Sequence, residues 1–315
     1  MLKPKLRPDE TTVAVLMGGW SAERKVSLSS GEACWGALRR AGFDAIMVDV
    51  KRETIISVLQ DMKPHVVFNA LHGTWGEDGV ASALFETLSI PYTHSGVLAS
   101  SVAMHKELSK TIFRSVGIPV AEGKIVALEV AAAGHSMSLP YVIKPVADGS
   151  SVGVHIVDRK SNWPLASLLD ERHIFGDEVM VERFIPGREL TCAVMGDVAL
   201  GVTEIIANTS FYDYEAKYAE GGSEHLLPAP VQGDVYRRCQ KYALSAHRAL
   251  GCRGITRSDF RYDDTNSENG ELIMLEINTQ PGMTGTSLVP ELARHAGHSF
   301  EELVTWMVND ASVSR

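Results

Sequence analysis

The chain has 315 residues, a formal net charge of −9 and 45% hydrophobic residues. This length is typical of about two domains, and the hydrophobic content can supply more than one core. The acidic balance argues against broad, sequence-independent binding of nucleic acid. It leaves room for a local basic cleft that holds a small anion.

The cysteines and the N-terminus favour a cytoplasmic protein. Cys34, Cys192, Cys239 and Cys252 form neither a C-x-x-C pair nor a zinc set, which is typical of buried thiols in a reducing compartment. The first twelve residues are charged and lack an apolar core, and no apolar run approaches the ~18 residues of a membrane span. We therefore expect a cytoplasmic enzyme or binding protein with neither a membrane nor a nucleic-acid partner.

The first hundred residues alternate between two hydrophobic patterns. Expected strands cover residues 12–19, 44–50 and 65–71, and expected helices cover residues 27–42, 54–62 and 79–89. This order predicts a mostly parallel sheet with helices on both faces. Ligands should gather at the carboxyl ends of its strands, where "GGWSAE" and "LHGTWGEDG" lie.

The pattern changes after about residue 104. A helix is expected over 104–117, strands over 139–146 and 152–157, a bend at 186–187, a helix over 235–252, a hairpin around 263–271 and a final helix after 297. The changes predict three domains, which cover residues 1–104, 105–187 and 188–315.

The segment "KPVADGSSVGV", residues 144–154, allows more than one chemistry. A Walker loop has its lysine after the glycines, and G-x-S-x-G puts Ser151 in the place of a hydrolase nucleophile. Both motifs need a helix directly after the glycines, whereas β-branched residues here predict strand, loop and strand. The functional interpretation is a flap that folds over an anion with Lys144 beside it. A plain hairpin loop is equally compatible with the fragment alone.

The hairpin near the C-terminus predicts a metal site. Arg257 and Asp259 share one strand face, and Glu276 and Asn278 share one face of the next strand. A turn centred near Ser267 places Asp259 opposite Glu276, so that two carboxylates and an amide oxygen converge. These ligands suit Mg²⁺. The alternative is an exposed polar face that Arg257 neutralises.

Five segments together resemble the signatures of one family. They are "GGWSAERKVS", "LHGTWGEDG", "KPVADGSSVGV", "FYDYEAKY" and "LEINTQPGMTGTSLVP". In this order and spacing they resemble the D-alanine–D-alanine ligases, which are ATP-grasp carboxylate–amine ligases, over roughly residues 13–304. The resemblance implies an α/β and α+β fold, in which a Rossmann-like N-terminal domain precedes two α+β domains that clamp ATP. It also implies ATP-dependent joining of two D-alanines through a D-alanyl phosphate, for peptidoglycan synthesis.

The resemblance implies a nucleotide site with three kinds of residue. The phosphates would contact Lys106, Lys144 and Lys217, beneath a cover of Gly149, Ser150 and Ser151. The adenosine would contact Glu182, Phe184, Ile185 and Glu189. Mg²⁺ or Mn²⁺, with two ions expected, would bind Asp259, Glu276 and Asn278.

The resemblance also implies two amino-acid sites and a homodimer. Glu23 would bind the ammonium of the first D-alanine, with His72 near its carboxylate. Arg257 and the backbone N–H of Gly282 would stabilise the oxyanion. The carboxylate of the second D-alanine would contact Ser287, Leu288 and Lys217. Tyr218 would link a closing loop to Glu23 and Ser150.

Several of these residues have structural alternatives. Lys106 could lie on a solvated helix face, and Glu23 could be a carboxylate in the first turn of a helix. His72 could be a loop histidine whose hydrogen bonds are made within the protein. "FYDYEAKY" could be an amphipathic helix with Tyr214 and Tyr218 packed on a core.

Three positions depart from the family pattern, and three rival functions stay open. His105 stands where the family pattern has an acidic residue, Gln280 where it often has a serine or threonine, and Gly285 where it has a bulkier residue. The resemblance places these differences near the walls of the second amino-acid site. The rivals are a D-Ala–D-Ser or D-Ala–D-lactate ligase, a serine hydrolase that uses Ser151, and a noncatalytic nucleotide-binding module. Tyr218 favours an amine nucleophile, because the lactate enzymes lack it.

Overall fold

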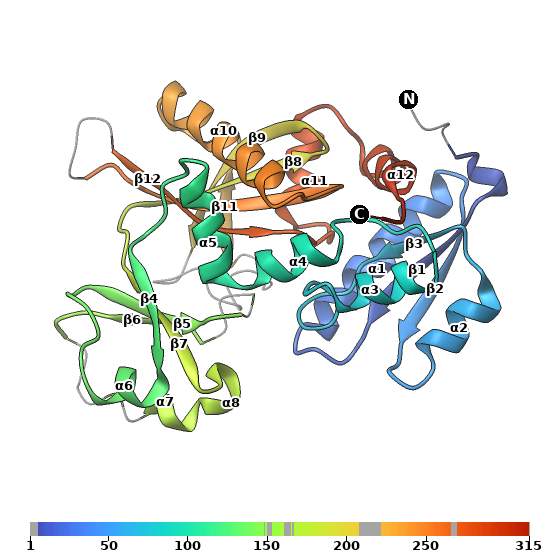
Figure 1. The fold of residues 1–315 in the computed structure, drawn as a ribbon. Coiled ribbons are helices and arrows are strands. Elements are labelled where there is room, and N and C mark those ends of the chain that lie inside the picture. The colour runs from blue at the N-terminus through green and yellow to red at the C-terminus, as the bar shows by residue number, and fades with distance from the viewer. Residues whose placement is uncertain are drawn as a thin grey trace.

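The computed structural model describes residues 6–147, 149, 153–160, 165, 167–207, 222–265 and 270–314. These residues form three sheets, of three, five and four strands. Each sheet carries its own helices, and the three units lie side by side in Figure 1.

The N-terminal unit is the predicted parallel sheet. Its strands are β1 (Thr12–Gly18), β2 (Asp44–Val50) and β3 (Val66–Asn69), in the order β2-β1-β3. Its helices are η1 (Pro8–Glu10), α1 (Arg24–Arg40), α2 (Ile55–Met62) and α3 (Val80–Thr87). Alternate residues of β1 enter different cores. Val13 and Val15 pack into the core that includes α1, whereas Ala14 and Leu16 pack into the core of α2 and α3. The sheet is therefore covered on both faces, as predicted.

The last helix of the chain returns to this first sheet (Figure 1). Helix α12 (Phe300–Asp310) begins with a capping box between Ser299 and Glu302. Its Leu303 and Met307 share a core with Val13 of β1.

The four-stranded sheet contains the predicted strand–loop–strand. Its strands are β4 (Gly123–Ala127), β5 (Tyr141–Pro145), β6 (His155–Val157) and β7 (Glu178–Arg183), in the order β4-β7-β5-β6, and its helices are α6 (Leu128–Ala133), α7 (Ser167–Asp170) and α8 (Arg172–Phe175). Strands β5 and β6 pair antiparallel with Tyr141 opposite Val157. The Gly/Ser cluster therefore connects two paired strands. A Walker loop or a hydrolase elbow would instead connect a strand to a helix.

The five-stranded sheet is antiparallel and has a helix on each face. Its strands are β8 (Arg188–Met195), β9 (Val198–Ala207), β10 (Ser223–Leu226), β11 (Ile255–Asp263) and β12 (Glu271–Asn278), in the order β10-β9-β8-β11-β12, and its helices are α10 (Gly233–Ala249) and α11 (Leu288–His295). Cys192 and Val194 of β8 pack toward α10, whereas Ala193 and Met195 share a core with α11.

The predicted helix over 104–117 corresponds mostly to the second of two consecutive helices, and the break between them lies at His105. Helix α4 (Val97–Met104) ends at His105, whose backbone is extended, and α5 (Lys106–Ser115) begins directly after it. Nδ1 of His105 accepts from the backbone N–H of Leu108 at 3.4 Å, so the histidine caps α5. Ala103 of α4 and Phe113 of α5 pack into the core beneath the five-stranded sheet. The division of the chain at 104 and 187 into three domains stays a prediction.

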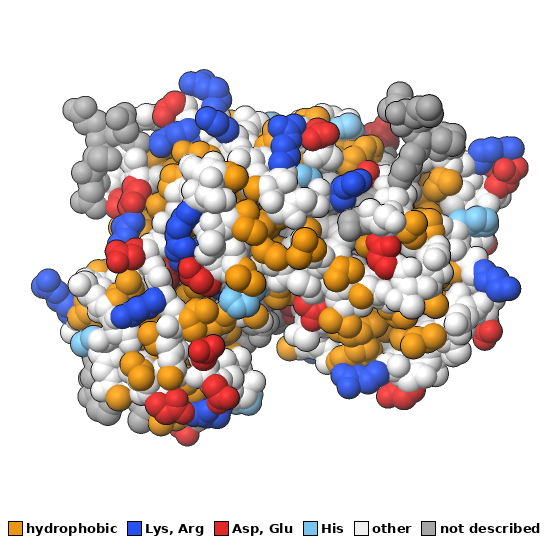
Figure 2. Space-filling view, in the orientation of Figure 1, with side chains coloured by type: hydrophobic (Ala, Val, Ile, Leu, Met, Phe, Trp, Pro, Cys, Tyr) orange, Lys and Arg blue, Asp and Glu red, His pale blue; other side chains and the backbone are white. Residues whose placement is uncertain are grey.

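The cysteines lie in the interior, and charged side chains of both signs lie on the surface. All four cysteines are free and buried, and burial raises the pKa of the Cys239 and Cys252 thiols to about 12. No helix among the described residues combines the length and the apolar character needed to cross a bilayer. On the face in Figure 2, Lys and Arg side chains are interspersed with Asp and Glu.

Candidate active site

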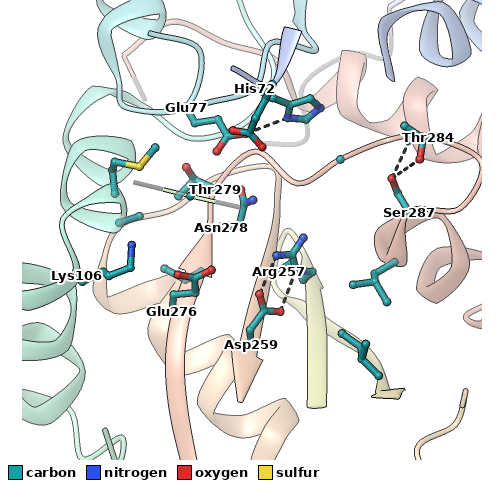
Figure 3. Close-up of a pocket in the computed structure, with 18 of the residues that line it drawn as sticks. His72, Glu77, Lys106, Arg257, Asp259, Glu276, Asn278, Thr279, Thr284 and Ser287 are labelled. Atoms are coloured by element: carbon teal, nitrogen blue, oxygen red, sulfur yellow. Dashed lines mark hydrogen bonds and ion pairs between the residues drawn. The ribbon is translucent and has the colours of Figure 1, made fainter. Parts of the chain in front are cut away.

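One pocket lies where the three units meet (Figure 3). Its walls contain most of the predicted site residues that the structure describes. They are Glu23, His72, Lys106, Gly149, Arg257, Asp259, Glu276, Asn278, Gly282, Ser287 and Leu288. Because these residues come from separate regions of the chain, folding alone brings them together.

The β11–β12 hairpin has the predicted register. Asp259 pairs with Glu276, and Arg257 pairs with Asn278. The register shifts by one residue after Asp259, which marks a β-bulge beside the site. The bulge leaves the polar pairs facing the pocket in Figure 3. The alternative of a solvent-exposed polar face is wrong for Asp259, which is buried.

Arg257 and Thr191 hold the Asp259 carboxylate in place. Arg257 Nε donates to Asp259 Oδ1 at 2.9 Å, and Arg257 Nη2 donates to Oδ2 at 2.8 Å. Thr191 Oγ1 donates to Asp259 Oδ1 at 2.7 Å. Such a two-pronged arginine contact fixes direction as well as charge.

The hairpin supplies oxygen ligands that fit Mg²⁺ or Mn²⁺. Two carboxylates and the Asn278 amide are hard donors, and Mg²⁺ commonly binds one or two carboxylates together with water and phosphate oxygens. Among the described residues no three acidic, histidine or cysteine side chains cluster as a complete metal cage. The oxygens of Asp259, Glu276 and Asn278 are nevertheless of the kind that Mg²⁺ binds.

Two lysines enclose the Glu182 carboxylate. Lys144 Nζ of β5 donates to Glu182 Oε1 of β7 at 2.8 Å, and Lys110 Nζ of α5 donates to Oε2 at 2.5 Å. Burial raises the pKa of Glu182, but the two ammoniums outweigh this effect and hold it below its usual value. Burial lowers the pKa of Lys110 despite the attraction of Glu182. The sequence analysis missed Lys110, although Lys106-x-x-x-Lys110 places both lysines one helical turn apart.

Lys106 begins α5 and lines the pocket. Its backbone N–H donates to the carbonyl of Val146 at 3.0 Å, which joins the start of α5 to the end of β5. The residue is 7% exposed, so the interpretation as a solvated helix face is wrong.

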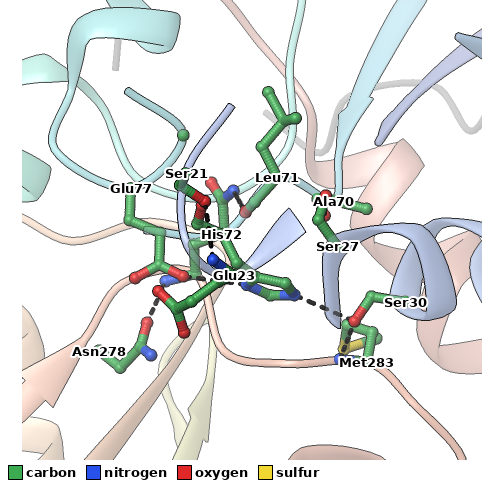
Figure 4. Close-up of polar contacts among 12 residues, drawn as sticks. Ser21, Glu23, Ser27, Ser30, Ala70, Leu71, His72, Glu77, Asn278 and Met283 are labelled. Carbon is green, nitrogen blue, oxygen red and sulfur yellow. Dashed lines mark hydrogen bonds and ion pairs between the residues drawn. The ribbon is translucent and has the colours of Figure 1, made fainter. Parts of the chain in front are cut away.

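His72 connects the loop after β3 to α1 and, through Ser30, to the loop after β12 (Figure 4). Its Nδ1 lies 2.9 Å from Glu77 Oε1, and its Nε2 lies 3.0 Å from Ser30 Oγ. Ser30 Oγ in turn accepts from the backbone N–H of Met283 at 3.2 Å, next to Gly282. A carboxylate only accepts, so the proton of the Glu77 contact lies on Nδ1, and in the neutral imidazole Nε2 then accepts from the serine hydroxyl. Glu77 was missed by the sequence analysis, although it lies inside "LHGTWGEDG".

Glu23 lies at the N-terminal end of α1 with its side chain in the pocket. It is the N-cap residue, so it precedes the first turn in which the alternative role as a helix carboxylate placed it, and its side chain makes no capping hydrogen bond. Gly73 leaves space for it, since a Cβ at Gly73 would lie 2.7 Å from Glu23 Oε2 and the backbone φ there is +71°. Ser21 Oγ donates to the carbonyl of His72 at 2.6 Å, which joins the loop after β1 to the loop after β3.

Ser287 and Leu288 lie at the N-terminal end of α11. Ser287 Oγ accepts from the backbone N–H of Thr284 at 2.9 Å and lies 2.8 Å from Thr284 Oγ1. Figure 3 shows this pair on the side of the pocket away from Lys106.

The predicted adenosine residues lie at the β7–β8 connection. Ile185 is buried with Ala121 and Ile273. Arg261 donates to the carbonyl of Ile185 at 3.1 Å and forms an ion pair with Glu189 at 3.4 Å. Phe184 is partly buried beside them. The contacts of Glu182, Phe184, Ile185 and Glu189 with a nucleotide stay a prediction.

Some predicted residues lie outside the described part of the chain. They are Ser150, Ser151, Lys217 and Tyr218. The amphipathic-helix alternative for Tyr214 and Tyr218 lies there too.

Comparison with known proteins decides the family. The family model for the D-ala D-ala ligase C-terminus matches residues 112–309. A D-alanine–D-alanine ligase from Parvibaculum lavamentivorans is 60% identical over 96% of this chain and 98% of its own length. This chain belongs to the D-alanine–D-alanine ligase family. The membership excludes the serine-hydrolase and noncatalytic-module interpretations.

Solved structures of the family share the fold. The D-alanine–D-alanine ligase from Bacillus anthracis, complexed with ATP, matches with a TM-score of 0.78 and 29% identity over 95% of this chain and 96% of that one. A D-Ala:D-Ser ligase from Enterococcus faecalis matches with a TM-score of 0.76 and 28% identity over 95% of this chain and 98% of that one. These matches bear out the predicted ATP-grasp fold. The backbone alone does not discriminate between D-alanine and D-serine as the second substrate.

Besides the cap at His105, a second departure from the family pattern has a structural role. Gln280 accepts from Asn69 Nδ2 at 2.8 Å and donates to the carbonyl of Leu71. It therefore joins the β12 end to the β3 end, and a shorter serine or threonine would not span the same gap.

Proposed function

We propose that this protein joins two D-alanines to D-alanyl-D-alanine and converts ATP to ADP and phosphate in the same reaction. The observation that carries the proposal is one pocket that holds Glu23 and His72 from the first unit together with Asp259, Glu276 and Asn278 from the last. The 60% identity to a D-alanine–D-alanine ligase supports it.

The site resolves a chemical difficulty. A carboxylate resists attack by an amine, so its oxygen must first become a good leaving group. The first D-alanine attacks the γ-phosphorus of ATP through a carboxylate oxygen, which gives D-alanyl phosphate and ADP. The amine of the second D-alanine then attacks the acyl carbon, loses a proton and expels phosphate.

Cations hold the nucleotide in this proposal. Lys106 and Lys144 contact the inner phosphates, and the segment that includes Gly149 covers the outer ones. Ser150 and Ser151 belong to the same cover, and Lys217 is a third lysine at the phosphates. Asp259, Glu276 and Asn278 would hold Mg²⁺ or Mn²⁺, which offsets the phosphate charge.

Opposite charges and donors bind the amino acids. Glu23 pairs with the ammonium of the first D-alanine, and His72, oriented by Glu77, lies near its carboxylate. Arg257 and the backbone N–H of Gly282 donate to the oxyanion, and one such donor lowers a barrier by about 3 kcal/mol.

The second substrate is held at the other end of the pocket. Its carboxylate contacts Ser287, beside Leu288 and near Lys217. Tyr218 closes over the site toward Glu23.

The context follows from the same proposal. The dipeptide would serve peptidoglycan synthesis, and the protein would act in the cytoplasm as a homodimer. The domains at 1–104, 105–187 and 188–315 would supply the first amino-acid site, the nucleotide cover, and the metal and second amino-acid sites.

A product assay tests the function. Purified protein with ATP, Mg²⁺ and D-alanine is expected to form ADP, phosphate and D-alanyl-D-alanine in equal amounts, and none without Mg²⁺. D-serine and D-lactate are offered with D-alanine in parallel reactions. Dipeptide without ATP consumption contradicts the proposal, and preferential formation of D-alanyl-D-serine or D-alanyl-D-lactate assigns the rival ligase activity.

A further inference from the structure

Lys110, Lys144 and Glu182 form a buried cluster with unequal charges. The three residues are 1%, 8% and 4% exposed. Each oxygen of Glu182 contacts one ammonium, at 2.5 Å for Lys110 and 2.8 Å for Lys144. Two ammoniums share this one carboxylate, and the other acid that attracts Lys110, Glu107, is itself paired with Arg114 at 3.0 Å. One positive charge of the cluster therefore has no carboxylate of its own. Such a buried excess is costly unless an anion compensates it.

The chain leaves space for Lys110 at Gly123. Gly123 of β4 pairs with Glu182 of β7. A Cβ at Gly123 would lie 3.1 Å from Lys110 Nζ and 2.9 Å from the carbonyl oxygen of Val181. A larger side chain would displace the ammonium from Glu182. The contact thus depends on three separate segments of the chain.

Lys110 also joins units that pack separately. It lies on α5, whose Phe113 packs beneath the five-stranded sheet, whereas Glu182 and Lys144 lie in the four-stranded sheet. Lys106, on the preceding turn of α5, lines the pocket. The Lys110–Glu182 ion pair therefore fixes the position of Lys106 relative to Lys144.

We propose that Lys110 is a positioning residue for ATP, which acts through Glu182 and does not touch the nucleotide. It neutralises the Glu182 carboxylate, so that the charge of Lys144 remains available to phosphate. Without Lys110, Glu182 and Lys144 form a neutral pair and the attraction for phosphate falls. This inference rests on the proposed nucleotide site.

Titration calorimetry with ATP and Mg²⁺, in the absence of D-alanine, measures the effect on binding directly. Lys110→Met is expected to weaken ATP binding about tenfold, by loss of a charge-assisted contribution. In turnover assays the KM for ATP should rise by a similar factor, while the KM for D-alanine stays within about twofold. Arg248→Met is the control, because it removes one positive charge from α10, where Arg248 forms an exposed ion pair with Asp197, and leaves the acids that attract Lys110 unchanged. The control should bind ATP as the wild type does.

The double variant Lys110→Met/Glu182→Gln separates charge from packing. With Glu182 uncharged, Lys144 keeps its positive charge, so the double variant should bind ATP more tightly than Lys110→Met. If Lys110→Met does not fold, Glu182→Gln and the double variant are compared instead. Loss of Lys110 should then cost less than threefold, since no carboxylate is left to neutralise.

Two results would overturn the inference. One is unchanged ATP affinity in folded Lys110→Met. The other is a loss on Lys110→Met that is equally large with Gln at position 182. A wild type that binds ATP but makes no dipeptide would instead contradict the proposed function and leave the binding comparison intact.

Discussion

Asp259 lies directly opposite Glu276 across the β11–β12 hairpin, and Arg257 grips the Asp259 carboxylate with two hydrogen bonds. Two carboxylates at such close range repel each other unless a cation reduces the repulsion. Arg257 does this for Asp259. A divalent ion shared with phosphate would do so for Glu276.

Glu276→Gln should therefore abolish most activity and leave the fold intact. We expect kcat to fall roughly a hundredfold, because a metal contact to the transferring phosphate contributes several kcal/mol. Turnover at saturating Mg²⁺ and thermal melting of the same sample check this. Glu271→Gln is the control, since Glu271 starts the same strand in an exposed ion pair with Arg183. Retained turnover in Glu276→Gln would remove this residue from the ligand set.

Glu77→Gln should weaken the first amino-acid site through His72. The carboxylate holds the Nδ1–H of the imidazole at 2.9 Å, and an amide can present a donor to Nδ1 instead. We expect the KM for D-alanine to rise about tenfold, by analogy with other orienting partners of histidine. The KM for ATP should change little. Equal changes in both constants would indicate a general loss of structure.

Gly73→Ala should lower both stability and activity. A Cβ there meets Glu23 Oε2 at 2.7 Å, and the left-handed backbone at φ +71° adds strain. We expect a loss of about 1 to 3 kcal/mol in the free energy of unfolding. Gly117→Ala separates the two causes, because Gly117 has φ +76° and nothing within 4 Å of the added methyl group. Chemical denaturation compares the two variants, and turnover should fall only for Gly73→Ala. Equal turnover in both would contradict the crowding of Glu23.

His247 should make stability depend on pH. Burial lowers its pKa to about 4 from an ordinary 6.5, and its Nδ1 lies 2.8 Å from Thr256 Oγ1. Between these values the unfolded chain binds a proton that the folded chain does not, so stability falls as the pH falls from 6.5 toward 4. The contribution is about 3 kcal/mol across the window.

His247→Gln should flatten this slope. Denaturant midpoints measured at several pH values for the wild type and the variant isolate the histidine, because the other titrating groups are common to both. Parallel pH profiles for the two proteins would show that His247 does not titrate as expected.

Local patterns predicted the parts of the fold that depend on neighbouring residues. Alternation in β11 and β12, with a turn near Ser267, was enough to place Asp259 opposite Glu276. The apolar runs at 12–19 and 65–71 predicted the buried parallel strands from continuous hydrophobicity and from the helices between them. Signals of this kind come from the local order of side chains, which the sequence displays directly.

Contacts between distant segments could not be predicted in this way. No local pattern links Lys110 to its partner, and only folding brings it to Glu182, 72 residues later. The packing of α12 against β1 has no local signal either, because an apolar helix face does not identify the sheet that it will cover. His105 was recognised as unusual, but its role as the cap of α5 required the backbone on both sides. The roles of Ser150, Ser151, Lys217 and Tyr218 stay predictions.

The proposed reaction depends on an acyl phosphate, and transfer of a carboxylate oxygen from D-alanine to phosphate tests its formation most directly. D-alanine labelled with ¹⁸O in both carboxylate oxygens is given to the enzyme with unlabelled ATP and water, and the released phosphate is analysed by mass spectrometry. If a D-alanyl phosphate forms, each dipeptide should be accompanied by one phosphate that carries one ¹⁸O. Unlabelled phosphate, formed in equal amount with dipeptide, would contradict the mechanism.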